Sequence, residues 1–231
     1  MNLFEVILYK PLFNVLILFY EFLPGRDLGF AIILLTVIIR LILYPLMSKS
    51  IKSQKKISRF QKEIEDIREK FKEDKETQAK ALISFYRKEK FNPFGGFLFL
   101  LIQLPILIAL YQVLSRGFQQ TELSNLYSFI PNPGLVNPTF LGLINLSQPN
   151  LIFAILAGIL QFLQSKVGFS EEKTEDSMAN FSNLIQHQMV YFFSVITFLF
   201  LLRLPSALAI YWITNSVFSI FQQHLIFKKH D

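Results

Sequence analysis

The sequence contains no cysteine and little charge. Of its 231 residues none is cysteine, and only 17% are charged while 52% are hydrophobic. Without cysteine, the chain cannot form disulfides, bind zinc through thiolates, use a thiol nucleophile or carry a lipid on an N-terminal cysteine. The three histidines, at positions 187, 224 and 230, are too scattered to indicate a metal site.

Other common signals are missing as well. We find no glycine-rich phosphate-binding loop, and the first residues lack the basic region and cleavage site of a signal peptide. The mean hydropathy is +0.40. This composition fits a multi-span helical membrane protein better than a soluble domain, and it predicts no cofactor.

Five apolar stretches are near the length needed to cross about 30 Å of hydrocarbon. The fourth is short and would need a tilt or a thinner bilayer. We therefore predict an all-α polytopic membrane protein with five transmembrane helices. The predicted spans are 28–47, 96–115, 150–167, 189–203 and 206–225.

The segment 1–27 is apolar but interrupted. Glu5, Lys10, Pro11 and Glu21 break its hydrophobic run. An interfacial amphipathic helix is favoured over a sixth span, although both remain open.

Basic residues concentrate in one loop. Residues 48–92 contain 14 of the 23 Lys and Arg residues and 8 of the 17 acidic ones, so this loop alone has the net charge of +6 of the whole chain. The positive-inside rule places it in the cytoplasm. By alternation the N-terminus and loop 116–149 lie outside, and the acidic loop 168–188 and the basic tail 228–231 lie inside.

The same loop has a coiled-coil pattern. Ile57, Phe60, Ile64, Ile67 and Phe71 are spaced three and four residues apart, and the pattern resumes at 79–86 after a charged turn. This predicts a cytoplasmic antiparallel helical hairpin over 48–92. Its charges either only keep it soluble or form a docking arm for an acidic partner, lipid head groups or ribosomal RNA. The candidate docking residues are Lys55, Lys56, Arg59 and Lys62.

Arg40 lies within the apolar first span, one turn after Thr36. A guanidinium at membrane depth costs roughly 2.5 kcal/mol or more, so it needs water, carbonyls or a counter-charge. The alternative is that Arg40 lies near the helix end and extends to the interface. No span contains an acidic residue. This argues against proton-driven transport and suits a site that attracts a visiting negative charge.

Proline and small residues mark several boundaries. Asn92–Pro93 predicts a helix start before the second span, and Pro205 predicts one before the fifth. Ala154 and Gly158 are four residues apart, which favours close helix packing in the third span.

Three stretches together resemble the YidC/Oxa/Alb membrane protein insertase family. They are LTVIIRLILYPL at 35–46, FNPFGG at 91–96 continued by LLIQLPILIALY at 100–111, and LPSALAIYWITN at 204–215 running on to Gln222 and Gln223. The similarity covers about residues 10–115 and 150–227, while loop 116–149 does not follow the usual family pattern.

The resemblance implies five spans and a cytoplasmic hairpin around a hydrophilic groove that opens to the cytoplasm and to lipid but not to the outside. Arg40 matches the family arginine of that groove, and in the third span either Gln161 or Gln164 faces it. Other implied groove positions are Thr36, Gln103, Tyr211, Trp212 and Asn215.

The family comparison also implies a function without chemistry or cofactor. A minimal bacterial form in the inner membrane is expected, with nascent membrane proteins and the lipid bilayer as partners, together with the ribosome and the Sec translocon but not DNA. The alternatives are a Sec-associated folding chaperone without autonomous insertion or, less favoured, a small channel or transporter.

Overall fold

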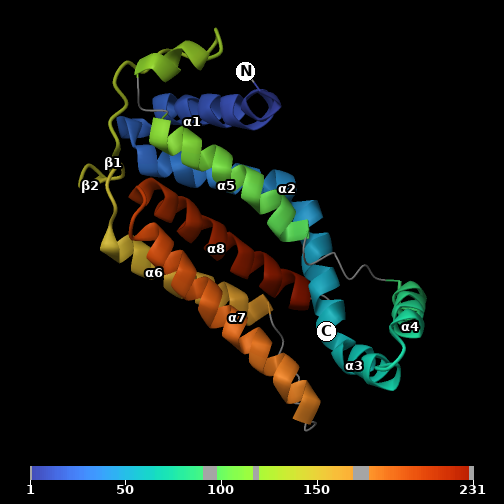
Figure 1. Ribbon diagram of the computed structural model, residues 1–231. Coiled ribbons are helices and arrows are strands. Elements are labelled where there is room, and N and C mark those ends of the chain that lie inside the picture. Colours follow the sequence, from blue (N-terminus) through green and yellow to red (C-terminus); the bar gives the residue numbers. More distant parts are fainter. Residues whose placement is uncertain (1, 91–97, 117–119, 169–176, 229–231) are drawn as a thin grey trace.

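The computed structural model describes residues 2–90, 98–116, 120–168 and 177–228 (Figure 1). The predicted helix start at Asn92–Pro93 lies outside these residues. The described part is mostly helical, as predicted, with one small strand pair that the sequence analysis did not predict. The helices are α1 Lys10–Phe22, α2 Leu28–Arg59, α3 Gln61–Lys70, α4 Lys75–Lys88, α5 Leu98–Arg116, α6 Leu151–Gly168, α7 Ser177–Leu201 and α8 Ser206–Lys228.

Helices α2, α5, α6, α7 and α8 form an elongated bundle, and α1 lies across one end of it (Figure 1). A π-helical turn at Glu5–Tyr9 leads into α1, which buries Phe13 and Tyr20 against its neighbours. Asn14 is also buried: its Nδ2 donates to the Asn125 carbonyl at 3.1 Å, and its Oδ1 accepts from the Tyr127 amide at 2.6 Å. Helix α1 is therefore joined to the segment after α5.

Helix α2 is longer than the predicted span. It continues past Pro45 to Arg59, so residues 48–59 extend the span helix, and a break at Phe60 separates it from α3. The loss of hydropathy after residue 47 marks the end of the apolar surface, whereas the backbone remains helical. Helix α7 likewise begins at Ser177, inside the segment predicted as loop 168–188.

Within the described residues, one segment, Leu28–Lys56, is long and apolar enough to cross a membrane, and an 18-residue window in it has a mean hydropathy of 2.5. Three other apolar segments are shorter: Leu101–Arg116, Leu151–Val167 and Val190–Leu201. The predicted fifth span belongs to α8, where several amide and hydroxyl side chains lower the hydropathy. The count of five spans stays a prediction.

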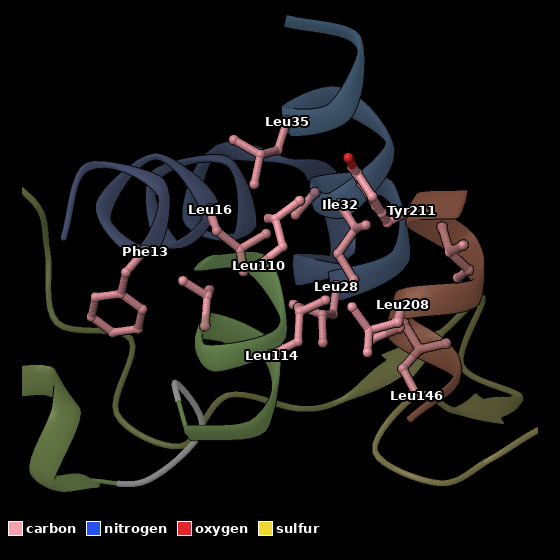
Figure 2. Packing of buried hydrophobic residues seen from close by; sticks show 14 of the residues in the cluster. Phe13, Leu16, Leu28, Ile32, Leu35, Leu110, Leu114, Leu146, Leu208 and Tyr211 are labelled. Carbon is pink, nitrogen blue, oxygen red and sulfur yellow. The ribbon is translucent and has the colours of Figure 1, made fainter. Parts of the chain in front are cut away.

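A dry apolar cluster fills the end of the bundle near α1 (Figure 2). It joins Leu28 of α2, Leu114 of α5 and Leu208 of α8 to Leu146 of the loop before α6, and each of these side chains is at most 2% exposed. The strands β1 Thr139–Phe140 and β2 Ile144–Asn145 pair in antiparallel fashion beside it. Phe140 packs directly on Gly29, where a Cβ atom would meet its ring at 2.0 Å.

Two predicted packing features are confirmed. Helix α8 begins directly after Pro205, and its first amides, from Ser206 and Ala207, donate to carbonyls of the loop before α6. Gly158 lets α6 approach α7 closely, since a Cβ atom there would lie 3.1 Å from the Cβ of Phe198.

Candidate functional site

Arg40 is buried between α2 and α8, with only 3% of the residue exposed. Its Nε donates to Asn215 Oδ1 at 2.6 Å, and its Nη2 donates to Ser219 Oγ at 2.6 Å. Asn215 and Ser219 are four residues apart and so lie on one face of α8. Ser219 donates its own hydroxyl hydrogen to the Asn215 carbonyl at 2.8 Å, which leaves its oxygen to accept from Arg40.

These partners of Arg40 are neutral. Burying a charge is costly unless hydrogen bonds or a counter-charge compensate, and here an amide and a hydroxyl supply hydrogen bonds without cancelling the charge. The predicted spans contain no acidic residue. The centre of the α2–α8 contact therefore carries a positive charge.

Thr36 lies one turn before Arg40 and is 1% exposed. Its hydroxyl donates to the Ile32 carbonyl of its own helix at 2.6 Å. Such bonds are common for threonine within helices. The lone pairs of the Thr36 hydroxyl can accept a further hydrogen bond on the face that it shares with Arg40.

Tyr211 and Trp212 connect α8 to two other helices. Gln103 of α5 donates through Nε2 to the Tyr211 hydroxyl. Trp212 donates through Nε1 to Gln161 Oε1 of α6 at 2.9 Å. Two neighbouring residues of α8 thus fix α5 and α6, while Asn215, one turn further on, contacts α2.

The predicted groove residues therefore meet along α8. Three of its side chains each pair with one predicted partner from a different helix, and Thr36 is the exception because it bonds within α2. The structure gives Gln161 the hydrogen bond to Trp212, whereas Gln164 is 8% exposed and its Oε1 has no partner among the described residues.

The sequence did not single out Ser216 and Ser219 on the same helix, and Gln222 and Gln223 entered only as part of the family resemblance. Ser219 was not among the candidates, although its i+4 spacing from Asn215 is a usable signal. Gln222 donates through Nε2 to the Tyr44 carbonyl and to Ser48 Oγ, both at 3.1 Å. Among the described residues, the following buried side-chain oxygens of α8 have no hydrogen-bond partner: Ser216 Oγ, Gln222 Oε1 and Gln223 Oε1.

The candidate docking residues do not all belong to the hairpin. Lys55, Lys56 and Arg59 are on the end of α2, and Lys62 lies in the first turn of α3. The Nζ atom of Lys55 lies 5.4 Å from the ring centre of Phe227 in α8, a cation–π distance. The structure thus places Lys55 at the base of the hairpin, in contact with the end of α8.

The helices α3 and α4 pack together and bury part of the predicted seam. Phe60 and Phe85 meet edge to face with ring centres 5.5 Å apart, and Ile64 of the seam is 6% exposed. Asp74 caps α4 by accepting from the amides of Glu76 and Thr77, both at 3.0 Å. The Thr77 hydroxyl and these amides lower the pKa of the Asp74 carboxyl.

The described residues offer no group of three or more His, Asp or Glu side chains that could hold a metal ion. What the arrangement along α8 provides is a buried cation and several amide and hydroxyl groups. These groups can bind and orient a polar or anionic segment through hydrogen bonds.

Comparison with known proteins gives consistent matches. Residues 18–231 match the family model described as 60Kd inner membrane protein. A protein of Fusobacterium nucleatum named membrane protein insertase YidC is 32% identical over 224 residues, covering 94% of this chain and 98% of the relative. A protein of the same name from Geobacter metallireducens is 34% identical, covering 96% of this chain but 37% of the relative.

A solved structure matches as well. The crystal structure described as active YidC insertase with the first transmembrane domain resolved aligns with a TM-score of 0.60 and 26% sequence identity. The alignment covers 96% of this chain and 46% of that one. The chain thus spans nearly all of the Fusobacterium relative but less than half of the longer proteins.

Proposed function

This chain belongs to the 60Kd inner membrane protein family, and we propose that it acts, like the relatives named YidC, as a membrane protein insertase. It receives hydrophobic segments of nascent membrane proteins from the cytoplasm and releases them laterally into the lipid bilayer. The observation that carries the proposal is Arg40, a charged residue 3% exposed in an apolar helix and bonded to α8 through neutral groups.

The proposed membrane arrangement has five spans, formed by α2, α5, α6, α7 and α8. The helices α3 and α4 lie in the cytoplasm, and loop 116–149 lies outside together with α1, which lies along the interface. The distribution of basic residues supports this orientation. The broad apolar surfaces of α6 and α7, including Ile155, Ile159, Phe192 and Val195 at 42% to 57% exposure, support contact with lipid.

The chain offers a direct test of this topology because it has no cysteine. Single cysteines at exposed positions, Ser84→Cys in α4 and Leu143→Cys in the strand-pair loop, can be labelled with a membrane-impermeant maleimide in intact cells. Leu143→Cys should react and Ser84→Cys should react only after lysis. The reverse result would contradict the orientation.

The proposed mechanism needs no covalent step. A short hydrated tail of the substrate enters between the cytoplasmic halves of α2, α6 and α8, and Arg40 attracts it when it is acidic. The buried oxygens of Gln164, Ser216 and Gln223, which lack partners among the described residues, support a wet path, because buried polar groups ordinarily bind water or protein. A wet path shortens the distance that the tail must cross in dry hydrocarbon.

The packed apolar cluster around Leu28, Leu146 and Leu208 supports closure of this path toward the outside. The substrate would therefore leave sideways into lipid rather than through a pore. Partition of its hydrophobic part into lipid and the membrane potential acting on its charged tail drive release.

The experiment uses the purified chain in liposomes without Sec components. A single-span substrate with an acidic or a neutral outer tail is presented, and protection of the tail from protease is measured. Arg40→Ala should reduce insertion of the acidic-tail substrate about tenfold and of the neutral one much less, and Arg40→Lys should retain more activity. Arg203→Ala, an exposed arginine between α7 and α8, is the matched control.

Equal losses for both tails would contradict attraction by Arg40. The wild-type protein could instead crosslink to the substrate without protecting its tail from protease. That result would contradict autonomous insertion and favour a Sec-dependent chaperone role.

A further inference from the structure

A polar cavity of about 150 Å³ lies beside the turn that leads into α1. Helix α1 is at the end of the molecule away from α3 and α4 (Figure 1). The end of α5 and the 3₁₀ turn Gln120–Asn125 complete the walls of the cavity. An apolar cavity of about this size in another protein holds benzene, so a group of several heavy atoms fits. The lining residues are Glu5, Tyr9, Gln112, Arg116, Glu122 and Asn125.

The cavity combines both signs of charge. Glu5 and Glu122 supply carboxylates, and Arg116, exposed at the end of α5, supplies a guanidinium. Glu122 is held in place because its Oε2 accepts from the Tyr9 hydroxyl at 2.7 Å and from Asn125 Nδ2 at 2.9 Å. Burial and the neighbouring Glu122 raise the pKa of Tyr9, so the phenol keeps its proton and remains a hydrogen-bond donor.

Apolar side chains flank this polar group. Val6 and Ile7, next to Glu5, are 51% and 58% exposed, and Ile108, one turn before Gln112 on α5, is 49% exposed. A water-soluble ligand would gain nothing from these neighbours. A ligand with a zwitterionic head and hydrocarbon tails would use both the charges and the apolar margins.

We propose that this cavity binds the head group of a zwitterionic phospholipid with a primary amine, of the phosphatidylethanolamine type, in the outer leaflet. Glu5 and Glu122 accept hydrogen bonds from the ammonium, and Arg116 donates to the phosphate. The acyl chains lie along Ile7 and Ile108. The outer-leaflet assignment rests on the proposed topology, whereas the head-group preference does not.

The charges argue against other lipids. An anionic head group without an amine would meet two carboxylates against the single guanidinium of Arg116, so repulsion would exceed attraction. A choline head group keeps the positive charge but has no N–H to donate to Glu5 or Glu122, and its three methyl groups need more room.

The test measures which lipid the full chain retains. The protein is reconstituted in vesicles containing equal parts of phosphatidylethanolamine, phosphatidylcholine and phosphatidylglycerol. It is then extracted in a mild detergent, and the bound lipids are quantified by mass spectrometry. We expect phosphatidylethanolamine to be enriched several-fold over both others. Arg116→Gln and Glu122→Gln should each bring the retention of the three lipids close to equal, because each removes a charge-assisted hydrogen bond to the head group.

Matched controls make the same substitutions at exposed sites elsewhere. Arg203→Gln, between α7 and α8, and Glu69→Gln, in α3, should leave the enrichment unchanged. Tyr9→Phe removes the hydrogen bond that positions Glu122 but keeps both carboxylates, so it should weaken the enrichment less than Glu122→Gln does. Equal retention of the three lipids, or enrichment that survives both Arg116→Gln and Glu122→Gln, would overturn the proposal. Preferential retention of phosphatidylglycerol would overturn it in favour of a simple anion site at Arg116.

Discussion

Both halves of α8 bury side chains, but the chemistry of these buried side chains differs. Residues 206–211 bury mainly Ala, Leu and Ile against the apolar cluster, whereas residues 215–223 bury Asn, Ser and Gln against Arg40 and its surroundings. The first half is held by close packing of side chains and the second by hydrogen bonds. One helix thus changes its mode of packing along its length, and burial alone does not identify a dry core.

The largest effect on stability is expected in the apolar half. Leu208→Ala removes a side chain that is 1% exposed and leaves a cavity, so the free energy of unfolding should fall by about 2–5 kcal/mol. Val217→Ala, on the same helix at 51% exposure, should change it by less than about 0.5 kcal/mol. Denaturant unfolding in detergent micelles measures both. Similar losses at the two positions would remove the distinction between the packed cluster and the rest of α8.

An intermediate effect is expected where Arg40 meets the polar half. Asn215→Ala removes the acceptor of its Nε, and a lost hydrogen bond to a charged group costs about 1.5–3 kcal/mol. The neighbouring Thr214→Ala is the control, because that hydroxyl bonds only to the Ile210 carbonyl in the described structure. The same unfolding measurement distinguishes them, and an Asn215→Ala variant as stable as Thr214→Ala would contradict the role of this contact.

The substitution Ser216→Ala should hardly change the free energy of unfolding, although Ser216 is fully buried. Its hydroxyl has no partner among the described residues, so Ser216→Ala removes a polar group without breaking a hydrogen bond. The free energy of unfolding should stay within about 0.5 kcal/mol of wild type or rise. A loss as large as that of Leu208→Ala would show that tight packing extends into the polar half.

A local effect is expected in the hairpin, which lies outside both halves. Because the folded pKa of Asp74 is lowered, its capping contribution is present above the unfolded value of about 3.9 and is lost as pH falls through the folded value. Hydrogen exchange of the Glu76 and Thr77 amides, corrected for intrinsic rates, should lose protection only below about pH 4. Asp74→Ala should abolish this pH dependence and leave hydrogen exchange in α8 unchanged. Loss of protection of the wild-type amides near neutral pH would contradict the capping role of Asp74.

Much of the site could be predicted because a polar residue in an apolar run is conspicuous. Arg40 and Asn215 stand out in this way, and the structure joins them. Ser219 does not stand out, since a serine in such a helix usually bonds to its own backbone and only tertiary contact reveals that it also accepts from Arg40. The hydrogen bonds of Asn14 to the loop after α5 had no sequence signal, because they join residues more than 100 positions apart.

Some features of the fold could likewise be predicted from local sequence, whereas others depend on contacts between distant residues. Close packing at Gly158 followed from small-residue spacing, because that rule depends on local sequence alone. The ends of α2 and α7 could not be predicted from hydropathy, which reports the apolar surface rather than the backbone conformation. The strand pair after Pro138 depends on its docking against Gly29 and the start of α8, which are distant in sequence.

The paired contacts of Tyr211 and Trp212 also determine how α8 can turn. Successive residues of an α-helix point about 100° apart, so the bonds to Gln103 and Gln161 hold α8 from two directions. Rotation of α8 about its axis in either sense would stretch both bonds at once. Asn215 lies one turn beyond Tyr211 on the same face, and its angular position is therefore fixed toward Arg40. If α8 moves away from α2, it must therefore tilt or slide without rotating about its own axis.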